Sequence, residues 1–358
     1  MLSNITIMQS KALNVTLALI ILYGLIPYIY ANVLENGNSE IIDYTLRGLV
    51  YSGITIVCLL AFRKLSLMDN LNVKFGFWLT TNEALFFYKV VFLLSVISFL
   101  IAPWHAVREG LMASISALCR MLWILVAIPL LNGRKSKVIL LLSVILMFLD
   151  GSRTFIFIVF IYYFLSHKIP KYQIVLGLLP VLLVASFRNG FYSFDLLYGI
   201  FGEGVNGSSG VYQVMKVQNA RVDWPVFQHM FYTFFQPFLI FFTLPFPRSL
   251  VNIDSAQFVS TIVNTTLSQQ YYPMGGFYIL SEFIPYGYFG ILLFCLYFFV
   301  SFRLSSLLLD SKAVLFAPAL LFMMIKSSPY TYWKWVIWFF IIQFVFKIFS
   351  TSLRRNNA

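Results

Sequence analysis

Residues Gly275–Val300, GGFYILSEFIPYGYFGILLFCLYFFV, form an apolar run that decides the class of fold. About 20 apolar residues are enough for a helix to cross the hydrocarbon layer of a membrane, and this run is long enough to do so. Its only acidic residue, Glu282, lies about two turns inside the run. We therefore predict a membrane-spanning helix that carries a carboxylate at an energetically costly position.

The whole chain has the same apolar character. Of its 358 residues, 60% are hydrophobic and only 11% are charged, and the mean hydropathy is +0.84. Soluble domains contain about 25% charged residues. Segments of alternating polarity, which are typical of membrane β-barrels, are not visible. The sequence predicts an all-α polytopic membrane protein with about 10–11 transmembrane helices, built as a single integral domain over residues 1–358.

Ten apolar segments are the predicted spans, and the first begins just after Lys11 without a signal-peptide cleavage motif. In chain order they are Leu13–Ala31, Leu46–Phe62, Leu85–Trp104, Leu111–Leu131, Val138–Asp150, Thr154–Ser166, Tyr172–Phe187, Gly275–Val300, Ala313–Lys326 and Trp335–Phe349.

The basic loops set the expected orientation. They share one side of the predicted membrane: Arg63, Lys64, Arg134, Lys135, Lys137, Lys168, Lys171, Arg303, Lys312, Arg354 and Arg355. The positive-inside rule makes this side the cytoplasm, with both termini on it. The net charge of +12 then reflects membrane topology, and no nucleic-acid partner is expected.

One large loop, residues 188–273, is left on the outer side. Within it, residues 227–246 (FQHMFYTFFQPFLIFFTLPF) are apolar enough to span, but the following residues are polar up to Met274. We predict an interfacial or re-entrant helix, bent at its prolines, of which Pro237 is the most central. The alternative is a true span, in which case a neighbouring segment such as the seventh does not cross.

Arginines are concentrated on the outer side, where the positive-inside rule predicts few. Four of them are candidate diphosphate ligands, because guanidinium groups hold phosphate oxygens in pairs: Arg153, Arg188, Arg221 and Arg248. Arg153 follows a tight Gly151–Ser152 turn at a predicted helix start, a position that favours anions. The alternatives are an ordinary hairpin for Arg153 and contact with lipid headgroups for Arg188 and Arg248.

His229 and Glu282 are the candidate catalytic residues. Histidine transfers protons readily near neutral pH, and a carboxylate inside a span is usually functional or paired. The alternative for Glu282 is a structural salt bridge, for which Arg120 in the fourth span is a possible partner. Tyr271, Tyr272 and Lys326 are weaker candidates at the predicted outer face.

Several familiar catalytic motifs are missing. The sequence contains no Walker loop, no His-Glu-x-x-His and no Gly-x-Ser-x-Gly. Its three cysteines are isolated in apolar runs, which indicates small buried side chains. We expect no metal and no cofactor. An Asp-x-Asp motif is also missing, so a nucleotide sugar is not the expected donor.

Two short stretches resemble bacterial O-antigen (Wzy-type) polymerases. Gly275–Gly276, Ser281–Glu282–Phe283 and Tyr288–Phe289–Gly290 resemble the Gly-Gly…Glu…Phe-Gly helix of that family, and Gly151–Thr154 resembles its Ser-Arg hairpin. The many spans and the late outer loop are also similar. The resemblance implies a GT-C-like membrane glycosyltransferase. Such an enzyme transfers a glycan from undecaprenyl diphosphate to the sugar hydroxyl of an incoming lipid-linked repeat unit.

The same resemblance implies a location and partners. The chain would lie in the bacterial inner membrane, with its active face toward the periplasm, and would work with a chain-length regulator, a flippase and a ligase. Only Arg153 and Glu282 match the family motifs. Two alternative functions are an O-antigen ligase, with a similar layout, and a flippase or transporter of the lipid-linked unit. A transporter favours repeated halves, which this sequence does not show.

Overall fold

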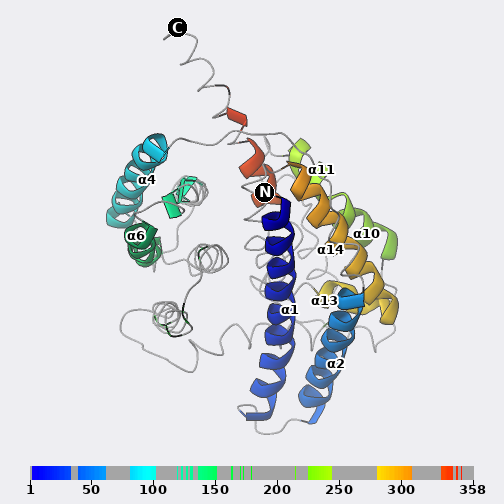
Figure 1. Ribbon diagram of the computed structural model, residues 1–358. Helices are drawn as coiled ribbons and strands as arrows, with labels where there is room; N and C mark the ends of the chain where they lie inside the picture. Colours follow the sequence, from blue (N-terminus) through cyan, green and yellow to red (C-terminus); the bar gives the residue numbers. More distant parts are fainter. Residues whose placement is uncertain are drawn as a thin grey trace. The chain divides into compact units, whose positions relative to one another are not determined.

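The computed structural model of the chain describes residues 2–33, 39–61, 81–101, 136–150, 225–243, 280–308 and 332–341, together with isolated positions within 119–131, 163–179, 214 and 344–348 (Figure 1). The described segments are helical, and no strand occurs among them. Four described stretches are long and apolar enough to cross a membrane: Thr16–Val33, Ser39–Ala61, Ala84–Ile101 and Tyr288–Ser305. These helices mark the chain as an α-helical membrane protein.

The chain divides into two compact units. The first comprises Met1–Val73, Phe201–Leu308 and Leu320–Ile337, and the second comprises Lys74–Ile200, Leu309–Ala319 and Trp338–Ala358. In the second unit, α4 (Thr81–Ile101) packs against α6 (Ser136–Asp150). The candidate site lies in the first unit.

Helices α1 (Leu2–Val33) and α2 (Ser39–Ala61) lie side by side in the first unit (Figure 1). They approach closely at Gly24, where an added Cβ atom would lie 2.7 Å from Ser52 Oγ. Ser52 donates a hydrogen bond to the Gly48 carbonyl at 2.8 Å, so its hydroxyl is satisfied within α2. Small residues permit such close packing between membrane helices. Helix α2 also packs against α14 and thereby supports the segment that carries Glu282.

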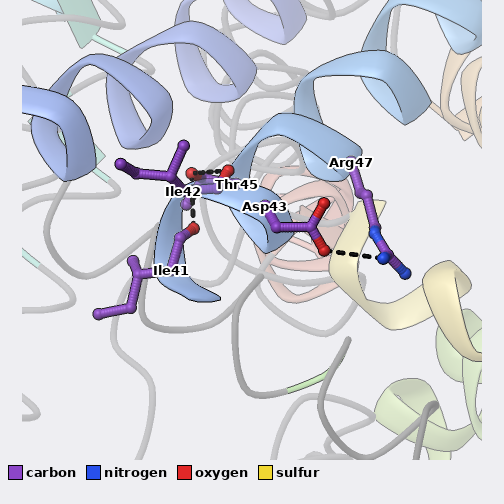
Figure 2. Close-up of polar contacts among 5 residues, drawn as sticks. All are labelled: Ile41, Ile42, Asp43, Thr45 and Arg47. Carbon is purple, nitrogen blue, oxygen red and sulfur yellow. Dashed lines mark hydrogen bonds and ion pairs between the residues drawn. The ribbon is translucent and has the colours of Figure 1, made fainter. Parts of the chain in front are cut away.

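The first turns of α2 carry its charged side chains. Figure 2 shows the ion pair between Arg47 and Asp43, with Arg47 Nη2 2.7 Å from Asp43 Oδ2, and both side chains are about half exposed. The Thr45 hydroxyl donates to the carbonyls of Ile41 and Ile42, as Figure 2 also shows. An exposed pair adds little stability. The Arg47–Asp43 pair lies near the N-terminal end of α2, which the sequence predicts to be outside the membrane.

Two short helices, α10 (Val226–Phe234) and α11 (Gln236–Thr243), form the aromatic segment of the large loop. They are separated by a bend at Phe235. Pro237 follows this bend and cannot donate a hydrogen bond to the preceding turn. The proline bend predicted within residues 227–246 is therefore present in the described part.

The two faces of α10 and α11 have opposite character. Three polar side chains, His229, Thr233 and Gln236, are at most 1% exposed. The exposed face consists largely of phenylalanines: Phe227, Phe231, Phe235, Phe238, Phe241 and Phe242. A helix in water shows the reverse arrangement. Buried polar groups with an aromatic outer face are typical of a segment that contacts lipid.

Helix α10 contacts the segment around the start of α14 (Tyr288–Leu308) through two aromatic side chains. His229 contacts Tyr286, just before α14, whereas Phe234 packs edge-on against Tyr297, with ring centroids 5.6 Å apart. Because α14 contains a candidate span, α10 lies beside membrane-crossing structure. Whether this segment is interfacial, re-entrant or a true span stays a prediction.

The predicted span Gly275–Val300 is not one helix in the structure, which corrects the sequence-based expectation. It contains α13 (Leu280–Phe283), the 3₁₀ helix η2 (Ile284–Tyr286) and then α14. Gly287 has a φ of 59° and a ψ of −143°, a conformation that side chains other than glycine's strongly disfavour. Pro285 also removes a backbone donor. Glu282 therefore lies before the break, and not inside the long helix.

Gly290 allows the broken segment to fold back closely. A Cβ atom at this position would overlap the carbonyl oxygen of Phe283 and would lie 2.6 Å from Tyr51 Oη. Tyr51, near the middle of α2, donates a hydrogen bond to the same Phe283 carbonyl at 3.2 Å. A neighbouring span thus binds the backbone directly at the interruption. These contacts fix the backbone beside Glu282.

Where the structure describes most of a predicted span, that segment is helical. Leu13–Ala31, Leu46–Phe62, Leu85–Trp104 and Val138–Asp150 match α1, α2, α4 and α6, and residues 332–341 are helical at the start of the last span. The spans Leu111–Leu131, Thr154–Ser166, Tyr172–Phe187 and Ala313–Lys326 lie outside the described residues, apart from isolated positions, and so does most of loop 188–273. The orientation, the single domain and the GT-C-like arrangement stay predictions.

Candidate functional site

The structure brings His229 and Glu282 together, although 53 positions separate them along the chain (282 − 229 = 53). His229 Nε2 lies 3.7 Å from Glu282 Oε2, within ion-pair reach but beyond a direct hydrogen bond. The two side chains are 1% and 0% exposed. Helix α10 supplies the imidazole and α13 supplies the carboxylate. Both residues proposed from sequence as catalytic therefore belong to one site.

Tyr286 is the third member of this site, and sequence reasoning missed it. Its hydroxyl oxygen lies 2.5 Å from His229 Nδ1, a short hydrogen bond. The two rings are nearly parallel, with an interplanar angle of 15° and centroids 5.7 Å apart. Tyr286 belongs to η2, one turn after Glu282. The break at Pro285 and Gly287 is the sequence signal that marks this tyrosine among the 21 in the chain.

The His229 and Glu282 side chains are ionisable groups buried away from water. Taking two ionisable groups out of water is expensive, and their attraction offsets that loss only in part. In membrane proteins, ionisable side chains that face the protein interior generally serve binding, proton transfer or ion movement. Imidazole and carboxylate can exchange a proton, so the site can hold either a neutral pair or an ion pair. Such a pair can accept a proton and later release it.

Aromatic side chains surround the site and hold its backbone in place. Phe283, next to Glu282, packs edge-on against Phe294 and lies at a tilt to Tyr297. Tyr297 in turn accepts a hydrogen bond of 3.1 Å from Trp333 Nε1. These four side chains are at most 2% exposed. The site is thus built on rigid, close-packed elements, which favours fixed geometry at the His229–Glu282 pair.

The bond between Trp333 and Tyr297 gives a first test of this packing. We expect Trp333→Phe to lower the free energy of unfolding by about 1 kcal/mol, because it removes the donor to a buried hydroxyl. The measurement is the thermal unfolding of the purified protein in detergent. A double-mutant cycle with Tyr297→Phe isolates the hydrogen bond from the change in ring size. If the two substitutions had strictly additive effects on the free energy of unfolding, the hydrogen bond between Trp333 and Tyr297 would contribute nothing to stability.

The other predicted site residues lie outside the described residues. These are the candidate diphosphate ligands Arg153, Arg188, Arg221 and Arg248, and the weaker candidates Arg120, Tyr271, Tyr272 and Lys326. The predicted salt bridge of Glu282 with Arg120 is among these untested expectations. The partner that the structure gives Glu282 is His229. Across the described ranges, no group of three or more His, Cys, Asp or Glu side chains is placed to hold a metal.

Comparison of the chain with protein-family models, with curated proteins and with solved structures found no match. The class of protein is therefore defined from the chain itself. It is an α-helical membrane protein with a buried histidine–glutamate pair and a partly buried tyrosine beside an interrupted helix.

Proposed function

We propose that this protein is a membrane glycosyltransferase that polymerises oligosaccharide repeat units carried on undecaprenyl diphosphate, as the resemblance to O-antigen polymerases implies. The observation that supports this function most is the buried His229–Glu282 pair. It provides a proton acceptor beside membrane-crossing helices, where a lipid-linked sugar would be bound. Glu282 is also, with Arg153, one of the two residues that match the family motifs.

The reaction requires a base more than an acid. The acceptor hydroxyl gives its proton to the His229–Glu282 pair, and its oxygen bonds to the anomeric carbon of the donor sugar. The bond from that carbon to the diphosphate oxygen breaks, and the electron pair leaves with the diphosphate. Diphosphate is stable as an anion and needs no proton to depart. Its charge does need cationic partners, and this is the role we propose for the outer arginines, Arg153, Arg188, Arg221 and Arg248.

A gel of the lipopolysaccharide made by a strain that lacks only this gene tests the function. We expect the ladder of long chains to collapse to core plus one repeat unit, and a plasmid copy of the gene to restore it. Unpolymerised units would still be made, moved across the membrane and ligated. Bare core would indicate the ligase or flippase alternative. An unchanged ladder would exclude this pathway.

A second candidate function is proton-coupled transport of the lipid-linked unit. Two observations favour it: an ionisable pair buried among membrane helices, and a helix interrupted next to that pair. Proteoliposomes distinguish the candidates. A transporter would move the lipid-linked unit between leaflets in response to a pH gradient, whereas the polymerase would lengthen the glycan without any gradient.

A further inference from the structure

We propose that Tyr286 is a catalytic residue that connects the acceptor hydroxyl to the buried base, so that Tyr286, His229 and Glu282 form a hydroxyl–imidazole–carboxylate relay. This inference rests on the proposed function and identifies how its buried base is reached. The relevant geometry is the 2.5 Å contact between Tyr286 Oη and His229 Nδ1, together with the 3.7 Å approach of His229 Nε2 to Glu282 Oε2.

The burial of the three residues indicates their order. His229 and Glu282 are at most 1% exposed, so neither is placed to contact a sugar directly. Tyr286 is only partly buried and is the one member of the three with remaining exposure. The relay therefore places Tyr286 between an incoming substrate hydroxyl and the two buried residues.

The relay requires one arrangement of the imidazole protons, and the contacts to Glu282 and Tyr286 favour it. Glu282, when ionised, can only accept hydrogen bonds, so the favoured neutral imidazole carries its proton on Nε2, facing the carboxylate. Nδ1 is then the acceptor, and the Tyr286 hydroxyl donates to it. The opposite tautomer would direct a lone pair of Nε2 toward the carboxylate, which is electrostatically unfavourable. Glu282 thus holds the imidazole in the tautomer that receives a proton from Tyr286.

Proton transfer through this relay is balanced at each atom. As the acceptor oxygen attacks the anomeric carbon, its proton moves to Tyr286 Oη, and the tyrosine proton moves to His229 Nδ1. Tyr286 ends the step neutral and accepts a hydrogen bond from Nδ1–H. His229 becomes imidazolium, stabilised by the Glu282 carboxylate. The positive charge stays buried beside its counter-ion while the diphosphate leaves, and reversal of the relay to water resets the site.

The test compares Tyr286→Phe with Tyr288→Phe, a matched control on a tyrosine that is 75% exposed at the start of α14. Both purified variants are given the lipid-linked repeat unit that accumulates in the deletion strain. We expect Tyr286→Phe to slow polymer formation by about 10²- to 10³-fold, and Tyr288→Phe to have no effect. Full activity of Tyr286→Phe would overturn the relay. Inactive wild-type protein would instead overturn the proposed function.

A second readout does not depend on activity. The chain has only three histidines, so ¹⁵N-histidine labelling gives a simple spectrum, in which His229→Asn identifies the signal of His229. The relay predicts a protonated Nε2 and an unprotonated, hydrogen-bonded Nδ1 in the wild type, with the Nδ1 signal shifted in Tyr286→Phe. A proton found on Nδ1, with Nε2 bare, would contradict the proposed direction of transfer.

Discussion

Glu282→Gln is expected to reduce polymer formation by about 10²- to 10⁴-fold, the range that general acid–base catalysis contributes. The substitution keeps the size and shape of the side chain but removes its charge. His229 Nε2 then faces a neutral amide, and an imidazolium formed during the reaction loses the adjacent carboxylate in a site that is 0–1% exposed. The rate of polymer formation by purified protein, measured on gels over time, checks this.

Folding is expected to survive this substitution better than activity does. Breaking a buried ion pair is most harmful when it leaves one charge without a partner. Here His229 can remain neutral, so no such charge is left. The control is Glu40→Gln, which removes an exposed carboxylate at the start of α2 and should leave the rate unchanged. If Glu282→Gln polymerised as fast as the control, the pair would have no role in proton transfer.

Gly290→Ala is expected to cause the largest loss of stability, about 1–3 kcal/mol, the range for an extra methyl group in a close-packed interior. The new methyl group would overlap the Phe283 carbonyl oxygen, which is backbone and cannot rotate away. It would also meet Tyr51 Oη at 2.6 Å and disturb the hydrogen bond from Tyr51 to Phe283. Because Phe283 adjoins Glu282, we expect activity to fall as well.

Gly53→Ala is the matched control, since a Cβ atom there has no other atom within 4 Å. The unfolding temperatures of the two variants in detergent measure the difference. We expect Gly53→Ala to be as stable as the wild type or slightly more stable, since alanine favours helix. If the two variants unfolded at the same temperature, the close contact of Gly290 with Phe283 would not be required for stability.

Hydropathy located the long apolar helices in the part of the chain that the structure describes. Length and apolar content placed α4 and α6 within about four residues, whereas α1 and α2 begin 11 and 7 residues before the predicted starts at Leu13 and Leu46. The hydrocarbon layer imposes length and apolar content on a spanning helix but does not limit how far the helix extends beyond the layer. Hydropathy did not locate the interruption after Glu282. Pro285 and Gly287 are visible in the sequence, but their apolar and aromatic neighbours keep the run uniformly hydrophobic.

The candidate site was predicted only in part. Glu282 and His229 were singled out individually, since a carboxylate in an apolar run and a histidine in an aromatic segment are both unusual. Their pairing depends on how α10 packs against α13 and η2, and one sequence does not specify that packing. Tyr286 was missed because tyrosines are common in this chain and are usually explained by the membrane interface. The arginine predictions lie outside the described residues and remain to be tested.

The most direct measurement uses the purified wild-type protein in lipid nanodiscs, supplied with the lipid-linked repeat unit from the deletion strain. The number of glycosidic bonds formed is compared with the amount of undecaprenyl diphosphate released. We predict glycans longer than one unit, one lipid diphosphate released for each new linkage, and almost no product from Glu282→Gln. Lipid-linked units that stay single in the presence of folded wild-type protein would contradict the proposed glycosyl transfer.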